Sequence, residues 1–204
     1  MPGPRPLGPD YYSGDAVSLA ADMLGKLLCT NIGGGIRRYR VTETEAYFGE
    51  EDSACHAHRC RTGRARVMYA AGGLAYIHRC HMYNLLTVTT GPEGHPEGVL
   101  IRGMEGFDGP GRVGRELGLD LSMYGSPMSP SGYLWMEDDG VALEFRTSER
   151  VGIQYASEED RARLWRFRAS GRRVLINGRR FGSRCQTPRS ESTWSATSRL
   201  SVRT

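Results

Sequence analysis

Lysine is almost absent from this chain: of its 27 basic residues, only Lys26 is a lysine. No apolar run approaches the roughly eighteen residues of a membrane-spanning helix, and the first six residues (MPGPRP) lack the apolar segment of a secretion signal. The five cysteines are an odd number in a chain large enough to bury a core, so they do not indicate a disulfide framework. We therefore expect a soluble intracellular protein with reduced thiols and no membrane partner, cytoplasmic or nucleoid-associated if bacterial and nuclear if eukaryotic.

The arginines that take the place of lysine are concentrated near the end of the chain. Residues 161–204 hold twelve arginines and one acidic residue, Glu191, for a net charge of +11, which leaves −7 for residues 1–160 of a chain whose total is +4. Guanidinium groups suit phosphate recognition, so the basic end predicts an anionic partner. A solvated tail without a specific partner explains the same charges equally well.

The length and the 39% apolar content predict one domain with a sizeable core. Residues 1–10 are rich in proline and glycine, which predicts a flexible lead-in. Residues 11–176 form the expected folded domain. Residues 177–204 are rich in arginine, serine and threonine, and we expect them to be disordered or loosely attached.

Hydrophobic patterning predicts a mixture of helices and strands. Apolar spacing after an Asp15 cap predicts a helix over residues 15–28. Three glycines at 33–35 then break the chain, and alternation of β-branched and aromatic residues predicts a strand over residues 36–47. The other elements expected are a polar loop (49–66), one or two strands (74–88), a strand (98–104), a short helix (112–117) and a hairpin (133–137 with 141–145) around Asp138-Asp139-Gly140.

Two carboxylates and a phenol share one face of the strand expected over residues 36–47. Side chains alternate along a strand, so Glu43, Glu45 and Tyr47 point to the same side. On these residues alone, the solvated face of an edge strand is the more frequent explanation. The functional alternative is that one carboxylate, partly desolvated beside an aromatic ring, has a raised pKa and acts as a general base.

The same stretch opens a series of motifs that resembles one known family. The run ETEAYFGEED (43–52), followed by His56, resembles the signature of the alkyladenine (3-methyladenine) DNA glycosylase family. Further motifs follow in that family's order: RARVMY (64–69), GLAYI (73–77), GVLIR (98–102), GPG (109–111), and RVGI (150–153) with WRF (165–167). The resemblance extends from about Leu7 to Phe167, and the order and spacing of the motifs make it specific.

This resemblance implies a mixed α/β (α+β) single domain around a curved, largely antiparallel sheet with flanking helices, with which the alternating strands are compatible. It implies a monomeric enzyme of base excision repair, without cofactor or metal, that acts on double-stranded DNA containing damaged purines. Such an enzyme flips out an alkylated or deaminated purine of the 3-methyladenine, hypoxanthine or ethenoadenine class and hydrolyses its N-glycosidic bond.

The resemblance also implies roles for particular residues. Glu45 corresponds to the carboxylate that activates water, and Arg102 to the arginine that places this water and a nearby phosphate. The backbone carbonyl of Val151 corresponds to a further water contact. Tyr47 and His56 correspond to the pair that holds the flipped base, by ring stacking and, for His56, by stacking or a hydrogen bond, because electron-poor purines are attracted to ring faces.

Phosphate binding and the choice of chemistry follow from other positions. Thr62, Arg64 and Arg66 resemble the family's phosphate-binding loop, to which the arginine-rich tail would add salt-sensitive attraction. Lys26 lies in the first expected helix, far in sequence from every motif, so we expect simple hydrolysis rather than Schiff-base chemistry. The terminal amine of Pro2 is the less favoured route to a Schiff base.

Residues 76–84 depart from the family pattern Tyr-x-Tyr-x-x-Tyr-Gly-Met. His78, in the expected base-binding pocket, and His81 take the places of the second and third tyrosines, and the glycine before Met82 is missing. The third tyrosine resembles a wedge that fills the space left by the flipped nucleotide. We therefore expect weaker binding of the flipped state, with His81, Met82 or Tyr83 as the wedge.

Two further departures concern specificity and fold. Thr87, also assigned to the base-binding pocket, stands where the family often has an asparagine that crowds the exocyclic amine of guanine, so discrimination among purines is left open. After Phe167, arginine- and serine-rich sequence replaces the family's closing strand.

A cluster of cysteines and histidines supports a rival hypothesis. Seven such residues lie within 27 positions, a density that suits zinc, although the run from 55 to 60 lacks a Cys-x-x-Cys spacing. The alternative function is a non-catalytic protein that binds damaged DNA and is stabilised by zinc. The seven residues are Cys55, His56, His58, Cys60, His78, Cys80 and His81.

Overall fold

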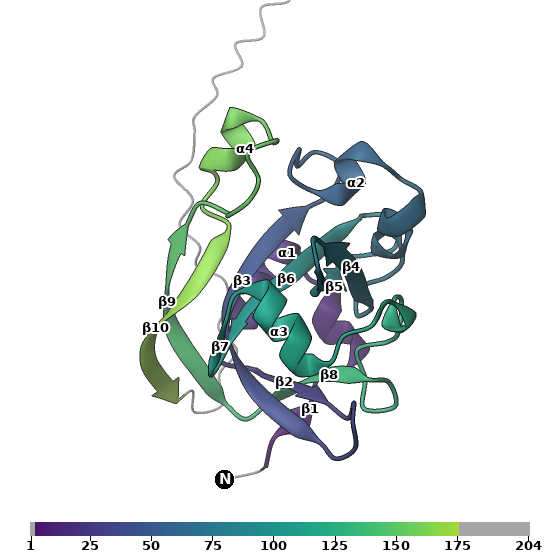
Figure 1. Ribbon diagram of the computed structural model, residues 1–204. Helices are drawn as coiled ribbons and strands as arrows, with labels where there is room; N and C mark the ends of the chain where they lie inside the picture. Colours follow the sequence, from purple (N-terminus) through teal and green to yellow (C-terminus); the bar gives the residue numbers. More distant parts are fainter. Residues whose placement is uncertain (1–2, 176–204) are drawn as a thin grey trace, which may run out of the picture.

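The computed structural model describes residues 3–175, which form a mixed α/β fold around a largely antiparallel sheet (Figure 1). This confirms the expected fold class. The strands are β1 (Arg5–Pro6), β2 (Leu27–Thr30), β3 (Arg37–Phe48), β4 (Ala75–Cys80), β5 (Tyr83–Thr90), β6 (Glu97–Met104), β7 (Phe107–Asp108), β8 (Leu134–Asp138), β9 (Val141–Ser148) and β10 (Arg166–Leu175). The α-helices are α1 (Ala16–Asp22), α2 (His56–Arg59), α3 (Pro110–Leu117) and α4 (Glu158–Ala162), and 3-10 helices span η1 (Pro9–Ser13), η2 (Gly63–Tyr69) and η3 (Leu121–Met123).

The long strand β3 organises the sheet. Neighbouring strands follow the order β1-β8-β2-β3-β6-β5-β4, while β10 pairs with both β3 and β9. The strand β3 therefore lies between β4 on one side and the β9–β10 pair on the other (Figure 1). Among residues 3–175, no helix is long and apolar enough to span a bilayer.

The two faces of β3 have different neighbours. Thr44 donates a hydrogen bond to the carbonyl of Ala20 in α1 at 2.6 Å, and Ala46 lies in the main hydrophobic core. Because side chains alternate along a strand, the odd-numbered residues at positions 43–47 point to the opposite face. Their carboxylates and phenol are thus set apart from the core that holds the sheet to α1.

The main core joins α1 and α3 to the central strands, and one glycine permits the close approach of α3. The core includes Leu19, Met23, Val113 and Leu117, all less than a tenth exposed. A Cβ atom at Gly114 would lie 1.9 Å from the backbone oxygen of residue 84 in β5. Only glycine fits at this contact, because any side chain would push the helix away from the strand.

The expected helix over residues 15–28 is too long. Asp15 does cap a helix, accepting a hydrogen bond from the Ser18 amide at 2.8 Å, but α1 ends at Asp22. Gly25 adopts φ +90, and a Cβ there would lie 2.7 Å from the Val141 carbonyl oxygen, so the chain turns at this point. The residues that follow form β2, whose apolar side chains are buried because the strand lies between β3 and β8.

The strands of the expected 133–145 hairpin exist, but they do not pair with each other. Strand β8 pairs with β1 and β2, whereas β9 pairs with β10. We expected arginine- and serine-rich sequence to replace a closing strand after Phe167, but the strand β10 continues past this residue to Leu175. The loop expected over residues 49–66 contains α2 and the start of η2, and the other strands and the helix near 112–117 are confirmed.

The ends of the chain differ in how much is described. The lead-in expected over residues 1–10 is attached to the sheet at Arg5–Pro6, which pairs with β8, and the Leu7 amide donates to the Met136 carbonyl at 2.8 Å. Backbone pairing thus holds a segment that its composition marked as flexible. The expected tail over residues 177–204 and the alternative amine of Pro2 lie outside the described residues.

Candidate active site

Glu45 is a completely buried carboxylate with three donors. One oxygen accepts hydrogen bonds from the Tyr47 hydroxyl at 3.0 Å and from Arg102 at 3.3 Å, and the other accepts from the Val151 amide at 2.8 Å. Burial raises the pKa of the Glu45 carboxyl, and the charge of Arg102 and the hydrogen bonds from Val151 and Tyr47 offset only part of this effect. The Val151 amide thus contacts Glu45 directly, while the water contact expected of its carbonyl stays a prediction.

Glu43, two residues earlier on the same face, has the opposite electrostatic environment. Its carboxylate accepts hydrogen bonds from Arg102 at 3.0 Å and Arg166 at 2.7 Å. Burial alone would raise the pKa of Glu43, but the bonds from Arg166 and Arg102 outweigh it and lower the pKa. The two carboxylates therefore differ in proton affinity, a pattern that in enzymes separates a group that exchanges protons from one that stays ionised.

Arg102 connects these carboxylates. It comes from β6, where Leu100 is paired with Glu45 in the register, so residue 102 lies on the same face one pleat further along. Its guanidinium reaches both Glu43 and Glu45, and only 13% of its side chain is exposed. The structure thus brings together Glu45, Arg102 and Val151, the three residues whose catalytic roles the family resemblance implies.

A buried ion pair that sequence analysis did not single out supports Tyr47. The Arg150 guanidinium binds both oxygens of Asp52, and neither side chain is more than 1% exposed. Its central carbon lies 5.0 Å from the centroid of the Tyr47 ring and 5.1 Å from that of Trp165, a cation–π arrangement. Arg150 also directly precedes Val151 in the chain. The buried ion pair therefore supports both the Tyr47 ring and the Val151 amide, two of the groups that donate hydrogen bonds to Glu45.

His56 and His78, the two histidines expected to hold the base, lie next to each other. Strands β6 and β5 separate His78 on β4 from Tyr47 on β3. His56 makes a 2.7 Å hydrogen bond through Nδ1 with the Tyr76 hydroxyl, and its ring centroid is 4.9 Å from that of His78. Burial and the nearby charges of Arg64 and Arg59 lower the pKa of His56. Burial, with His56 and Arg64, lowers the pKa of His78 to about 3. Both imidazoles are therefore neutral at neutral pH.

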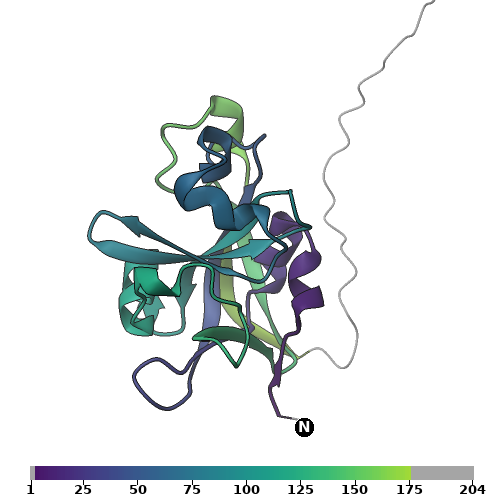
Figure 2. The ribbon, with the colours of Figure 1, turned by 90° about the vertical axis from the view of Figure 1, so that its right-hand side faces the viewer.

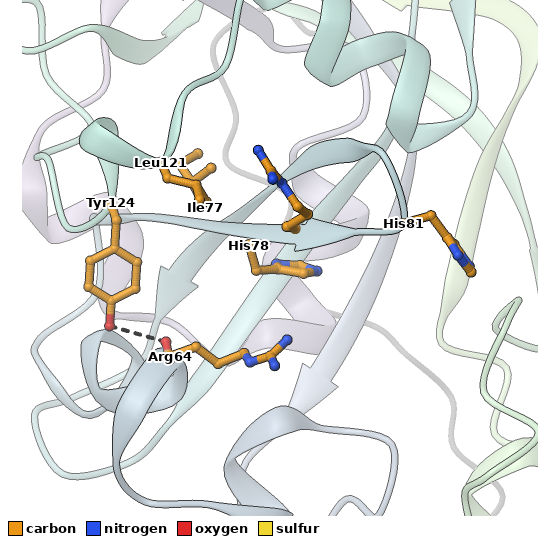
Figure 3. Close-up of a pocket in the computed structure, with 7 residues that line it drawn as sticks. Arg64, Ile77, His78, His81, Leu121 and Tyr124 are labelled. Carbon is orange, nitrogen blue, oxygen red and sulfur yellow. Dashed lines mark hydrogen bonds between the residues drawn. The ribbon is translucent and has the colours of Figure 1, made fainter.

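A cavity of about 510 Å³ runs along β4, the last strand on this side of the sheet (Figure 3). His78 and the Arg64 side chain lie on one side of the strand in this view, and Tyr124 donates a hydrogen bond to the Arg64 carbonyl at 3.1 Å. Of the residues expected to hold the base, His78 is the one that lines this cavity. The lining residues are Arg64, Ile77, His78, Arg79, His81, Leu121 and Tyr124.

The proposed phosphate loop has the exposure that such a role needs. Thr62, Arg64 and Arg66 are exposed, while Ala65 and Val67 between them are buried and attach η2 to the fold. Buried and exposed residues alternate here, so both arginines face solvent, and Arg64 also lines the cavity.

Comparison with known proteins decides the family. The profile of the methylpurine-DNA glycosylase family matches residues 10–173. The chain belongs to the methylpurine-DNA glycosylase family. A relative from Psychrobacter cryohalolentis is 34% identical over 191 residues, covering 78% of this chain and 89% of its own length. One from Methanocella arvoryzae is 34% identical over 179 residues (78% and 89%), and one from Borreliella afzelii 33% identical over 190 residues (86% and 98%). Each of these carries the name "Putative 3-methyladenine DNA glycosylase".

The hairpin between β4 and β5 is where this member of the methylpurine-DNA glycosylase family departs most from the expected family pattern. Figure 2 shows the hairpin projecting from the body of the fold. His81 adopts φ +52, a left-handed conformation that usually requires glycine. Met82 is 92% exposed at the tip, whereas Tyr83 packs against Gly111 and its hydroxyl accepts a hydrogen bond from Arg115 at 3.3 Å. Met82 thus projects from the hairpin tip, whereas Tyr83 is held against α3.

Thr87 lies inside the sheet on the same face as the site. It is 4% exposed, and the register pairs it with Tyr76 on one side and Leu100 on the other, which in turn is paired with Glu45. Residues opposite each other in a ladder share a face, so Thr87 lies on the line between Tyr76 and the Glu45 carboxylate.

The cysteines and histidines behind the zinc hypothesis do not converge. Among the described residues, no three cysteine, histidine or acidic side chains lie close enough to hold a metal ion. His56 binds Tyr76, and His58 makes a 2.6 Å hydrogen bond with the Glu50 carbonyl. The arrangement gives the zinc-stabilised alternative no support.

Proposed function

We propose that this protein is a monofunctional DNA glycosylase that flips damaged purines out of double-stranded DNA and hydrolyses their N-glycosidic bond. The observation that carries the proposal is the buried Glu45 carboxylate, bound by the Val151 amide, Arg102 and Tyr47. Membership of the methylpurine-DNA glycosylase family supports DNA as the partner. The enzyme acts as a monomer and its own side chains supply the chemistry.

Glu45 acts as the general base. A water molecule beside the carboxylate gives a proton to Glu45 as its oxygen bonds to the anomeric carbon of the flipped nucleotide. The bond between that carbon and the purine nitrogen breaks, and its electron pair leaves with the base. The raised pKa of Glu45 makes it a stronger base than an exposed glutamate, and Arg102 favours its ionised form before the reaction. The negative carboxylate also stabilises the positive charge that develops on the sugar.

The flipped base binds between Tyr47 on one side and His56 with His78 on the other. Alkylated purines such as 3-methyladenine are cationic in DNA, and a protonated histidine would repel them. The lowered pKa values of both histidines keep the pocket neutral, while the ring faces attract an electron-poor base. The same neutral pocket accepts hypoxanthine and ethenoadenine. Thr87 lies next to this pocket, because it is paired with Tyr76 in the ladder of β4 and β5.

Two surface features bind the duplex. Met82 at the hairpin tip enters the base stack at the place that the flipped nucleotide has left. It is therefore the wedge among the three candidates His81, Met82 and Tyr83. Thr62, Arg64 and Arg66 bind phosphates beside the pocket. Together they hold the DNA while the base is out of the helix.

Lys26 supports hydrolysis rather than Schiff-base chemistry. It is 8% exposed, and its ammonium group forms ion pairs with Asp138 at 3.2 Å and Asp22 at 3.8 Å. A buried, charged amine is a poor nucleophile, because attack requires a neutral and accessible nitrogen. The expected product is therefore an intact strand with an abasic site.

The test is single-turnover base release from duplexes containing 3-methyladenine, hypoxanthine or ethenoadenine, comparing the parent with Glu45→Gln. The proposal predicts release by the parent, without strand cleavage, and a loss of at least about a hundredfold in the variant, in the usual range for a general base. Glu43→Gln is the matched control and should lose less, because it changes the neighbouring carboxylate on the same face. Tight binding without release by either protein would instead support the non-catalytic binder.

A further inference from the structure

A strip of arginines continues the active-site face across β10 to β9. In the register, Arg166 of β10 is paired with Glu45, and Arg168 with Glu43, so both lie on the face of the site. Arg146 of β9 is paired with Arg168 and therefore shares this face. We call Arg146, Arg166 and Arg168 the β9–β10 arginine strip.

This face carries four arginines (Arg102, Arg146, Arg166 and Arg168) against three glutamates (Glu43, Glu45 and Glu144), so positive charge is in excess. Arg102, Arg166 and Arg168 all approach Glu43, with Arg168 at 3.9 Å and its side chain 60% exposed. Arg146 is exposed and forms no ion pair with any residue that the structure describes. Two like charges placed opposite each other on neighbouring strands cost stability, and Arg146 and Arg168 are such a pair. A bound anion would remove this cost.

We propose that the β9–β10 arginine strip binds a backbone phosphate of the damaged strand next to the flipped nucleotide. This inference rests on the proposed glycosylase function. The strip adjoins Glu45 on the β10 side of β3, whereas the loop of Thr62, Arg64 and Arg66 runs into η2, which contacts β4, β5 and β6 on the other side of β3 (Figure 1). The two basic sites therefore flank the catalytic carboxylate and grip the strand on both sides of the extruded nucleotide. Guanidinium groups suit this contact because they bind phosphate oxygens in pairs.

The first test measures the salt dependence of binding to a duplex that contains a non-cleavable abasic analogue. Loss of one phosphate contact should reduce the slope of log K against log salt by about 0.9, and affinity at low salt by about five- to tenfold. We expect this for Arg168→Gln and Arg146→Gln between about 50 and 200 mM salt. Arg168→Lys should retain the slope because it keeps the charge. Arg5→Gln, an exposed arginine on β1 at the far end of the strand order, is the matched control and should leave the slope unchanged.

The second test locates the phosphate. Single phosphates on either side of the abasic analogue are replaced by neutral methylphosphonates, and binding is measured for the parent and for Arg168→Gln. We expect one or two positions to weaken the parent and to have little further effect on the variant, because the contact is already lost. Thermal melting monitored by circular dichroism checks that each variant is folded.

The outcomes separate this inference from the proposed function. If the parent binds and releases base but Arg168→Gln and Arg146→Gln keep the parent's slope, the strip does not bind phosphate and the glycosylase proposal stands. Equal methylphosphonate effects in parent and Arg168→Gln would overturn the inference in the same way. If the parent neither binds the duplex nor releases any base, the proposed function itself fails.

Discussion

Breaking the buried pair between Arg150 and Asp52 is expected to cost a large part of the stability of this fold. Both side chains are at most 1% exposed, and the guanidinium donates to both carboxylate oxygens. Removing one partner from such a pair leaves an unpaired buried charge, which typically costs about 3–5 kcal/mol. Small domains have about 5–15 kcal/mol in total, so Arg150→Met or Asp52→Asn should remove roughly a third of the stability or more.

The measurement is urea unfolding of the two single variants and the double variant. Because either change alone leaves the other charge unpaired, the double variant should cost little more than each single one, so the coupling free energy should approach the cost of one single variant, about 3–5 kcal/mol. Glu159→Gln is the control. It breaks an exposed pair with Arg163, in which the glutamate is 83% exposed, and should cost less than about 1 kcal/mol because solvent screens the charges.

The pair should also affect the reaction, because Arg150 lies against the ring of Tyr47 and precedes Val151. Base release by Arg150→Met, measured at a temperature where it is folded, should slow more than binding weakens. Additive stability changes, or single variants that cost no more than Glu159→Gln, would refute the view that this ion pair holds the site together.

Three further predictions concern other parts of the molecule. Because folding lowers the pKa of His78 from 6.5 to about 3, the unfolded chain binds a proton that the folded chain does not, so stability should fall as pH drops below 6.5. Between pH 6.5 and pH 5, His78 should lower the free energy of unfolding by about 2 kcal/mol. Urea unfolding at the two pH values should show that His78→Phe lacks this loss, and equal acid sensitivity in the variant would contradict the reasoning. Met82→Ala should weaken binding to an abasic-analogue duplex more than to an undamaged one, whereas Tyr83→Ala should affect both duplexes equally; a selective loss in Tyr83→Ala but not in Met82→Ala would make Tyr83 the wedge. Gly114→Ala should lower the melting temperature sharply, since its Cβ would meet the backbone of Asn84 at 1.9 Å; an unchanged melting temperature would show that α3 shifts freely.

The face that carries the candidate site was predictable because it depends on a local rule. Alternation along β3 places Glu43, Glu45 and Tyr47 on one side in any register, and the structure places them so. Alternation does not predict that Glu45 is buried, because an exposed edge strand has the same alternating pattern. The ladder with β6 and β10 encloses Glu45, and that pairing joins residues more than fifty positions apart.

The errors arose where long-range pairing decides the structure. Residues 15–28 carry helical spacing throughout, but the strands that pair with Leu27–Thr30 override it. The turn at Asp138-Asp139-Gly140 was correctly placed, yet a turn signal does not state which strands pair. Arg150 gave no local sign of its role, because its partner Asp52 is 98 positions away in the sequence.

The central claim is that Glu45 removes the proton from the attacking water. It is tested most directly by the pH dependence of single-turnover base release under saturating enzyme. The account predicts a rate that rises with pH through an apparent pKa above the ordinary glutamate value of 4.5, and a slow rate without this rise in Glu45→Gln. The same rising limb in Glu45→Gln, at a rate close to that of the parent, would contradict it.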